Sequence, residues 1–70
     1  MRIAYDSEVD ALSISFRETT VETRHLGEGI TLEYDVAGQL AGLEILDAVR
    51  RFGDRETLRQ VVLQGLGPAA

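Results

Sequence analysis

The chain has 70 residues, no cysteine and a formal net charge of −5 at pH 7, and these values exclude several classes of protein. Without cysteine there is no disulfide, thiolate metal site or cysteine nucleophile, and a chain this short buries only about 60% of the surface that its unfolded form exposes. We therefore expect one domain, residues 1–70, whose small core is completed by oligomerisation, most simply as a homodimer.

The chain shows no segment that would place it in or across a membrane. No apolar run approaches the roughly 20 residues that span a bilayer, and the start "MRIAYD" lacks the apolar core of a signal peptide. The sequence therefore predicts a cytoplasmic protein without membrane partners.

The charge is unevenly distributed along the chain. Residues 1–46 carry nine acids against three arginines, and residues 47–70 carry three acids against four arginines. An acidic body repels phosphate backbones and attracts basic partners. Nucleic-acid binding is therefore not predicted, and a small basic protein is the favoured kind of partner.

Alternation of apolar and polar residues dominates the first two thirds of the chain. It predicts strands over residues 2–6, 11–16, 29–35 and 40–46, each with one apolar face, and the short links between them predict antiparallel pairing. The link between the hairpins is rich in threonine and could add a short edge strand over residues 20–24. The expected sheet is a four-stranded β-meander with this possible fifth strand.

The second hairpin constrains its own register. If Tyr34 faces Ala41, the apolar sets of the two strands share one face and the loop is residues 36–39. A type I turn suits this loop length, with Asp35 bonding the turn backbone and Gly38 adopting positive φ. Asp35 and Gly38 are therefore predicted to structure the turn.

The first hairpin follows the same arithmetic. Pairing Tyr5 with Leu12 leaves residues 7–10 as its loop, with Asp6 directly before the loop and Asp10 as its last residue. The alternating acids resemble the start of an EF-hand loop, but the glycine and the final glutamate of that loop are replaced by alanine and arginine. Asp6 and Asp10 are therefore interpreted as turn residues, and no metal site is predicted.

After residue 46 the pattern changes to a helical period. Asp54 can cap a helix over residues 54–65, in which Leu58, Val61 and Val62 mark one face. The predicted fold is therefore α+β, with this C-terminal helix packed on the apolar face of the sheet. Because one short helix shields two or three strands, some apolar surface is expected to stay exposed.

The carboxylates of Glu33 and Glu44 project to the polar face in this register, with Thr31 opposite Glu44. A general acid needs a dry pocket, which an open polar face does not offer, so ion pairs with Arg2 or Arg17 are the favoured interpretation. Glycine inside a strand often marks a close approach by another backbone or ligand. Glu44, Gly42 and Glu33 are therefore the candidate partner-binding residues.

The other reactive side chains do not form a recognisable catalytic set. His25 is the single histidine, and the two tyrosines fall on the apolar face, where they fit a core or an interface. The chain has no Gly-rich phosphate loop and no nucleophile elbow. We therefore assign no catalytic residue and no cofactor, and nothing in the sequence argues for an enzyme.

Two segments, "YDSEVDALSISF" and "GITLEYDVAGQLAGLEILDA", resemble the small bacterial proteins grouped as domain of unknown function 2283. The second segment is similar to the family pattern G-[IV]-x-L-[DE]-Y-D-x-x-G-x-[LIV]-x-G-[IL]-E-[IL]-L-x-A. The resemblance carries over a set of pattern positions and brings no established activity; it implies at most an antitoxin role beside small toxin-like proteins. The positions are Tyr5, Asp6, Asp10, Leu12, Gly29, Asp35, Gly38, Gly42 and Glu44.

These observations leave two functions open. The first is a homo-oligomeric protein-interaction module, with an acidic surface for a small basic protein that it could neutralise as an antitoxin does. The alternative is a protein that binds a small ligand or a divalent metal ion through the acidic residues of its hairpin loops.

Overall fold

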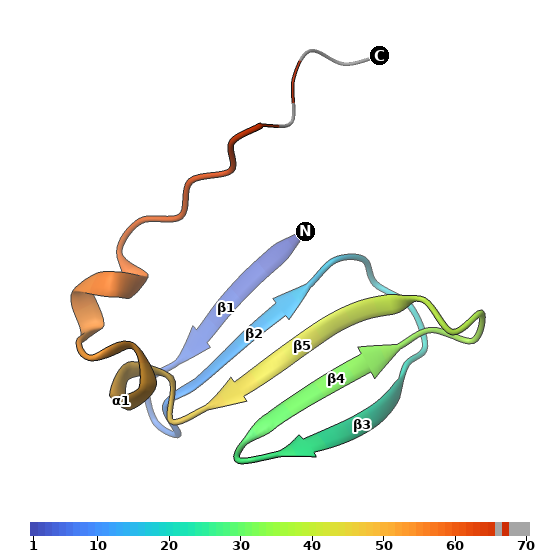
Figure 1. The fold of residues 1–70 in the computed structure, drawn as a ribbon, viewed down its shortest axis with the longest axis horizontal. Coiled ribbons are helices and arrows are strands. Elements are labelled where there is room, and N and C mark those ends of the chain that lie inside the picture. The colour runs from blue at the N-terminus through green and yellow to red at the C-terminus, as the bar shows by residue number, and fades with distance from the viewer. Residues whose placement is uncertain (66, 68–70) are drawn as a thin grey trace.

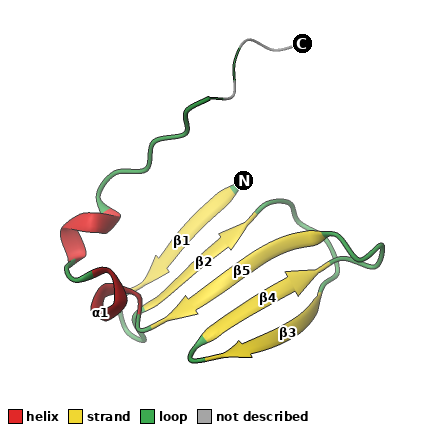
Figure 2. Cartoon of the chain, in the orientation of Figure 1, coloured by secondary structure: helices red, strands yellow, loops and turns green. Residues whose placement is uncertain are grey.

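The protein is an antiparallel five-stranded sheet followed by two short helical turns (Figures 1 and 2). The computed structural model describes residues 1–65 and 67. Its elements are β1 (Arg2–Asp6), β2 (Ala11–Ser15), β3 (Glu22–Gly27), β4 (Ile30–Tyr34), β5 (Leu40–Leu46), the helix α1 (Ala48–Phe52) and the 3-10 helix η1 (Arg55–Leu58). The prediction of a small α+β fold with an antiparallel sheet is confirmed.

The order of the strands in the sheet differs from the predicted meander. The order is β1-β2-β5-β4-β3, so the first hairpin pairs with the last strand in the chain rather than with the next one. This pairing places Leu12 opposite Ile45 and Ile14 opposite Leu43, which continues the apolar face without a break. The additional strand β3 forms at the edge beside β4, over Glu22–Gly27 rather than residues 20–24.

The predicted register holds along most of both hairpins. Tyr5 lies opposite Leu12 in the first hairpin, and Leu32 lies opposite Leu43 in the second. At the turn end of the second hairpin, however, Tyr34 pairs with Leu40 instead of Ala41. A register shift between β4 and β5 causes this difference, and the unpaired Ala41 is buried.

The C-terminal helix predicted over residues 54–65 is not formed. The chain has a helix at Ala48–Phe52, ended by Gly53 with φ 98°, and then a 3-10 helix at Arg55–Leu58. Residues 60–64 have no regular structure. A short helix gains its stability from packing rather than from propensity. Val61 and Val62 are exposed here, without a neighbouring surface against which a helix could pack. Neither helical turn covers the apolar face, because α1 lies at one corner of the sheet (Figure 1).

Because no layer covers the sheet, the core is very small. Among the described residues, the buried apolar side chains are those of Ala11, Leu12, Ala41 and Ala48, and no large side chain is fully buried. Most of the apolar face is half-buried at best, and Ile3 on the edge strand is 41% exposed. The protein is therefore a single layer in which the sheet provides both surfaces.

Candidate interaction surfaces

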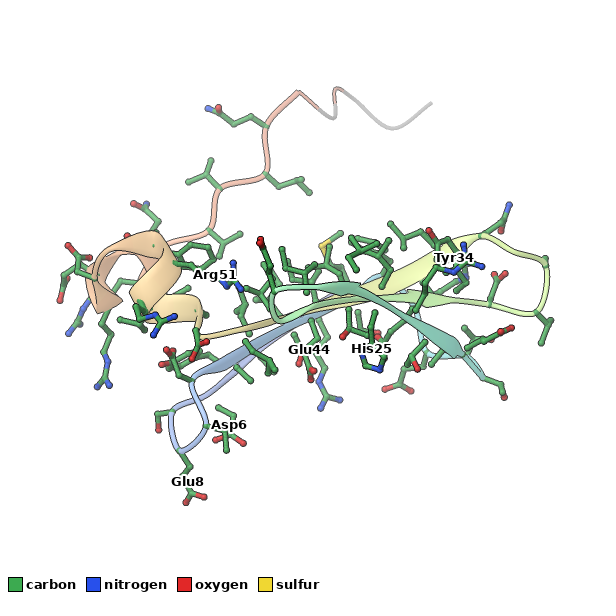
Figure 3. All side chains as sticks on the ribbon, turned by 60° about the horizontal axis from the view of Figure 1, so that its bottom comes forward. Asp6, Glu8, His25, Tyr34, Glu44 and Arg51 are labelled. Atoms are coloured by element: carbon green, nitrogen blue, oxygen red, sulfur yellow. The ribbon has the colours of Figure 1, made fainter. Side chains whose placement is uncertain are left out.

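The polar face of the sheet brings together the predicted Glu33, Gly42 and Glu44. Glu44 lies opposite Thr31, as expected from the sequence, and opposite Ser13 across the β2–β5 pair, which the sequence did not predict. His25 on β3 continues this row, and its Nδ1 lies 2.9 Å from Thr31 Oγ1. Figure 3 shows Glu44 and His25 projecting from the same side of the sheet. The sequence missed this contact of His25 because it required the position of β3.

The predicted ion pairs of Glu33 and Glu44 with arginine are not formed. Arg2 instead lies 3.7 Å from Glu18, in the link that follows β2, and Arg17 binds Asp35 in the turn between β4 and β5. The strand order explains the difference. Arg17 follows the end of β2, which pairs with the start of β5, so Arg17 lies beside the turn that contains Asp35. The two glutamates therefore remain as half-exposed acceptors on the polar face.

Gly42 is required by the protein's own chain. A Cβ atom at this position would lie 2.7 Å from the carbonyl oxygen of Ile14 on β2 and 2.6 Å from Oε1 of Glu33 on β4. The first contact involves backbone, which cannot give way as a side chain can. The close approach expected at this glycine is thus supplied by β2 and Glu33, without any partner.

Asp35 organises the turn between β4 and β5. Its Oδ1 accepts the N–H groups of Ala37 and Gln39, both at 2.9 Å, and its carbonyl oxygen accepts the N–H of Gly38, which has φ 82°. Arg17 donates to its other oxygen. The Gln39 N–H bond, together with the Arg17 guanidinium, holds the pKa of Asp35 below its usual range despite partial desolvation.

Asp10 joins three segments at the opposite end of the sheet. Its Oδ1 accepts the Tyr5 hydroxyl at 2.7 Å and the Val49 N–H at 2.9 Å, while its carbonyl oxygen accepts the Ala48 N–H at 3.0 Å. The Tyr5 hydrogen bond lowers the pKa of Asp10 and raises that of Tyr5. Tyr5 was predicted to serve only in a core or an interface, and its role as a donor was missed.

The acids of the hairpin loops bond to their own backbone and strands. Within residues 1–65 and 67, no group of three His, Asp or Glu side chains is placed to hold a metal ion. The oxygens of Asp6, Asp10 and Asp35 accept hydrogen bonds from the chain itself, including that of Asp6 with the N–H of Glu8 at 2.9 Å. The geometry thus gives no support to binding of a divalent ion by the hairpin loops.

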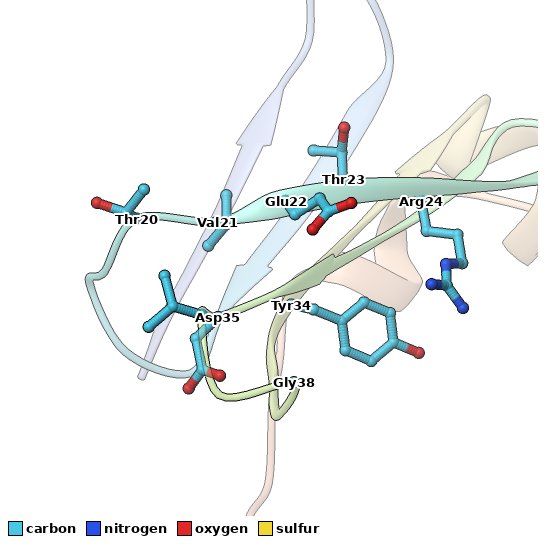
Figure 4. Close-up of a pocket in the computed structure, with 9 residues that line it drawn as sticks. Thr20, Val21, Glu22, Thr23, Arg24, Tyr34, Asp35 and Gly38 are labelled. Atoms are coloured by element: carbon cyan, nitrogen blue, oxygen red, sulfur yellow. The ribbon is translucent and has the colours of Figure 1, made fainter.

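An open hollow of about 400 Å³ lies between the start of β3 and the turn between β4 and β5 (Figure 4). Arg24 of β3 lies over the ring of Tyr34 of β4, with its guanidinium carbon 5.4 Å from the ring centroid, which is a favourable cation–π distance. The sequence could have indicated this pair only if the register of β3 had been known.

The apolar face extends across all five strands. Two rows cross all five strands: Ile3, Ile14, Leu43, Leu32 and Arg24 in one, and Tyr5, Leu12, Ile45, Ile30 and Gly27 in the other. The strand acids divide unequally between the faces, since Asp6, Glu33 and Glu44 occupy polar-face positions and Glu22 occupies an apolar-face position opposite Tyr34. The two faces therefore differ in both polarity and charge.

Comparison with known proteins places this fold in a family. Residues 2–48, more than half of the chain, match the family described as protein of unknown function DUF2283, and the chain belongs to this family of small domains. The search of curated proteins returned no match, and neither did the search of solved structures. In the part of the chain that the structure describes, no helix is long and apolar enough to cross a membrane.

Proposed function

We propose that the protein is a homo-oligomeric protein-interaction module that works through the two faces of its sheet. The observation that carries the proposal is the uncovered apolar face, which no helical turn of the described chain shields. A sheet buries its apolar face against another layer in almost every stable domain. A second copy of the chain supplies that layer.

The size of the exposed surface supports this role. The chain has an accessible surface of 5666 Å², whereas a compact monomer of this mass exposes about 4,300 Å². The excess of about 1,300 Å² exceeds the ~800 Å² that each partner contributes to a standard protein interface. The uncovered face of the sheet and the exposed residues after η1 both contribute to this excess.

The polar face is the proposed surface for a different, basic partner. Glu33 and Glu44 lie there with Asp6, so the acids of the strands are concentrated away from the proposed homo-oligomer contact. Complementary charge speeds the encounter of two proteins more than it adds to their affinity. Neutralisation of a small basic toxin-like protein, as an antitoxin performs it, is the narrower form of this proposal and rests on the family resemblance.

The first experiment measures self-association by analytical ultracentrifugation over a range of concentrations. We expect a dimer for the wild type and loss of the dimer for Leu32→Asp, which places a charge in the middle of the apolar face. Ile3→Asp makes the same test at an exposed edge position, where folding is less at risk. The matched control is Thr31→Asp, the neighbouring residue of β4 on the polar face, and it should leave the dimer intact. A wild type that stays monomeric at every concentration would refute homo-oligomerisation.

The second experiment tests the basic partner by gentle isolation of the tagged protein and native mass spectrometry. A stoichiometric basic protein whose association rate falls steeply with salt supports the acidic-face mechanism. Glu33→Gln and Glu44→Gln should slow its association, while Glu56→Gln, an acid outside the sheet, should not. Equal association rates at low and high salt would contradict the mechanism.

A further inference from the structure

The segment that follows η1 exposes three consecutive large apolar residues. Val61, Val62 and Leu63 are 67%, 62% and 73% exposed. We call residues 59–65 the C-terminal arm. Single exposed apolar residues are ordinary on protein surfaces, but a contiguous apolar run marks a site of contact. The arm therefore needs a surface to lie against.

The base of the arm is held firmly to one corner of the sheet. Asp10 accepts the N–H groups at the start of α1, and Arg51 Nε donates to the carbonyl oxygen of Leu46 at 2.8 Å. Ala48 is fully buried beneath this corner, and Asp54 accepts the Thr57 N–H at 3.2 Å to start η1. The folded part of the chain thus fixes the place from which the arm leaves.

From this corner the arm runs away from its own sheet. In Figure 3 the arm lies on the same side of the sheet as Tyr34 and Arg51, opposite to Glu44 and His25. In Figure 1 it runs clear of the strands, beyond the edge strand β1. The arm is therefore on the side of the apolar face without covering that face.

Resting on the homo-oligomer of the proposed function, we propose that two copies pack with their apolar faces together and exchange arms, so that each arm lies along the edge strand β1 of the second copy, at the margin of its apolar face. Packed sheets stand about 10 Å apart, which places a second sheet in the space on the side where the arm runs. Seven extended residues reach about 23 Å, and the five residues of β1 span about 17 Å, so the arm is long enough to follow this edge strand.

Charge favours a second copy as the occupant of this face. The protein carries a net charge of −5, which opposes close approach of two copies through most of its surface. At the apolar face, however, the strands contribute Arg24 beside Glu22, so the face presents charges of both signs. Two identical apolar faces can therefore meet with little repulsion, whereas a basic partner is attracted to the opposite face.

Cysteine cross-linking tests the exchange directly, because the chain has no cysteine of its own. Ile3→Cys and Leu63→Cys chains with different tags are co-expressed and oxidised, and we expect a disulfide between the two chains. The matched control pairs Leu63→Cys with Ser13→Cys, which is on the polar face, and should give none. The double variant Ile3→Cys/Leu63→Cys, examined as isolated monomer at low concentration, shows whether the arm folds back; an internal disulfide there, without the intermolecular one, overturns the exchange.

A second variant separates this inference from the proposed function. Replacing Val61, Val62 and Leu63 together by serine should raise the dimer dissociation constant about tenfold or more, since two exchanged arms lose their apolar contacts. An unchanged dissociation constant, with no cross-link between chains, refutes arm exchange and leaves the homo-oligomeric module intact. A wild type without any dimer refutes both.

Discussion

Two aspartates hold opposite ends of the sheet, and they do so differently. Asp35 bonds mainly to its own turn, at Ala37 and Gln39, and receives one distant donor in Arg17. Asp10 bonds to Tyr5 on the neighbouring strand and to Val49, which lies 39 residues further along the chain. The Asp35 turn is thus a local structure with one bond to a distant residue, whereas the Asp10 corner joins the sheet to the segment that carries the arm.

The difference shows that similar acceptor groups can have unequal consequences for the fold. Removing a local acceptor loosens one turn, because its donors can reach water when the turn relaxes. Removing an acceptor between distant segments loosens elements that meet at one place, as α1 and one corner of the sheet do (Figure 1). Variants in the Asp35 turn and at the Asp10 corner should therefore differ in the size and the spread of their effects on stability, with Gly42 in the middle of the sheet as a reference.

The largest effect is expected from Gly42→Ala, which alters neither aspartate. The new Cβ would overlap the Ile14 carbonyl oxygen, so β2 and β5 must move apart in the middle of the sheet. We expect a loss of about 1–3 kcal/mol in the free energy of unfolding, the usual range for overpacking. Urea unfolding measures this loss. A stability equal to wild type would show that the approach of Ile14 is not tight.

Asp10→Ala should be the more damaging of the two aspartate variants. It leaves the Val49 N–H and the Tyr5 hydroxyl without their acceptor and weakens the attachment of α1 to the sheet. We expect a melting temperature several degrees below wild type and faster amide exchange at Val49. If exchange at Val49 is unchanged, Asp10 does not hold the helix in place.

Asp35→Ala should lower the melting temperature less, and its effect should stay local. Amide exchange should increase at Ala37 and Gln39, while exchange at Val49 remains as in wild type. Arg17→Ala removes only the distant donor and should be milder still, with an effect that shrinks in high salt. Equal or greater loss for Asp35→Ala than for Asp10→Ala would reverse the proposed order.

Acid should weaken both sites. The pKa values of Asp10 and Asp35 lie below their ordinary value of 3.8 in the folded protein. Each carboxylate therefore contributes stability that is fully present above the unfolded-state pKa and is lost as the pH falls through the lower folded-state pKa. Thermal unfolding across acidic pH should show a shallower decline in Asp10→Asn/Asp35→Asn than in wild type. An identical decline would mean that other groups control acid unfolding.

Alkaline pH should distinguish the Asp10 corner from the Asp35 turn, with the smallest effect. The Tyr5 pKa is raised above 10.0 because its hydroxyl donates to Asp10. A raised folded-state pKa means stability that is present below the unfolded-state pKa and lost as the pH rises through the folded value. Tyr5→Phe should be less stable than wild type at neutral pH and lack this alkaline loss, whereas Tyr34→Phe should keep it. Persistence of the loss in Tyr5→Phe would contradict this assignment.

Sequence reasoning identified the strands and most of the register because alternation is a local signal. Tyr5 opposite Leu12 and Leu32 opposite Leu43 both follow from matching apolar sets across short loops. The same rule does not determine which hairpins become neighbours, since several orders keep one apolar face. The position of β5 between β2 and β4 therefore could not be predicted from periodicity alone.

The C-terminal helix was predicted from the spacing of apolar residues after Asp54, but the structure forms no helix over most of that run. The run from Leu58 to Gly65 has helical periodicity, but an isolated apolar face stabilises a helix only if it packs on something. The bonds of Arg17 to Asp35 and of Asp10 to Val49 were likewise beyond local patterns, because each joins segments far apart in the chain. At the interaction surfaces, the sequence indicated the residues of each face and the exposure of some apolar surface, but it wrongly placed a helix on the apolar face.

The family match ends at Ala48, the buried residue where α1 begins, so the arm lies entirely outside the matched segment. A shared sheet combined with a separately variable arm would divide two tasks in evolution. The sheet would preserve the folding pattern, while changes of a few apolar residues in the arm would decide which copies recognise one another. Two related proteins in one cell would then each form their own homo-oligomer without any change in the strands.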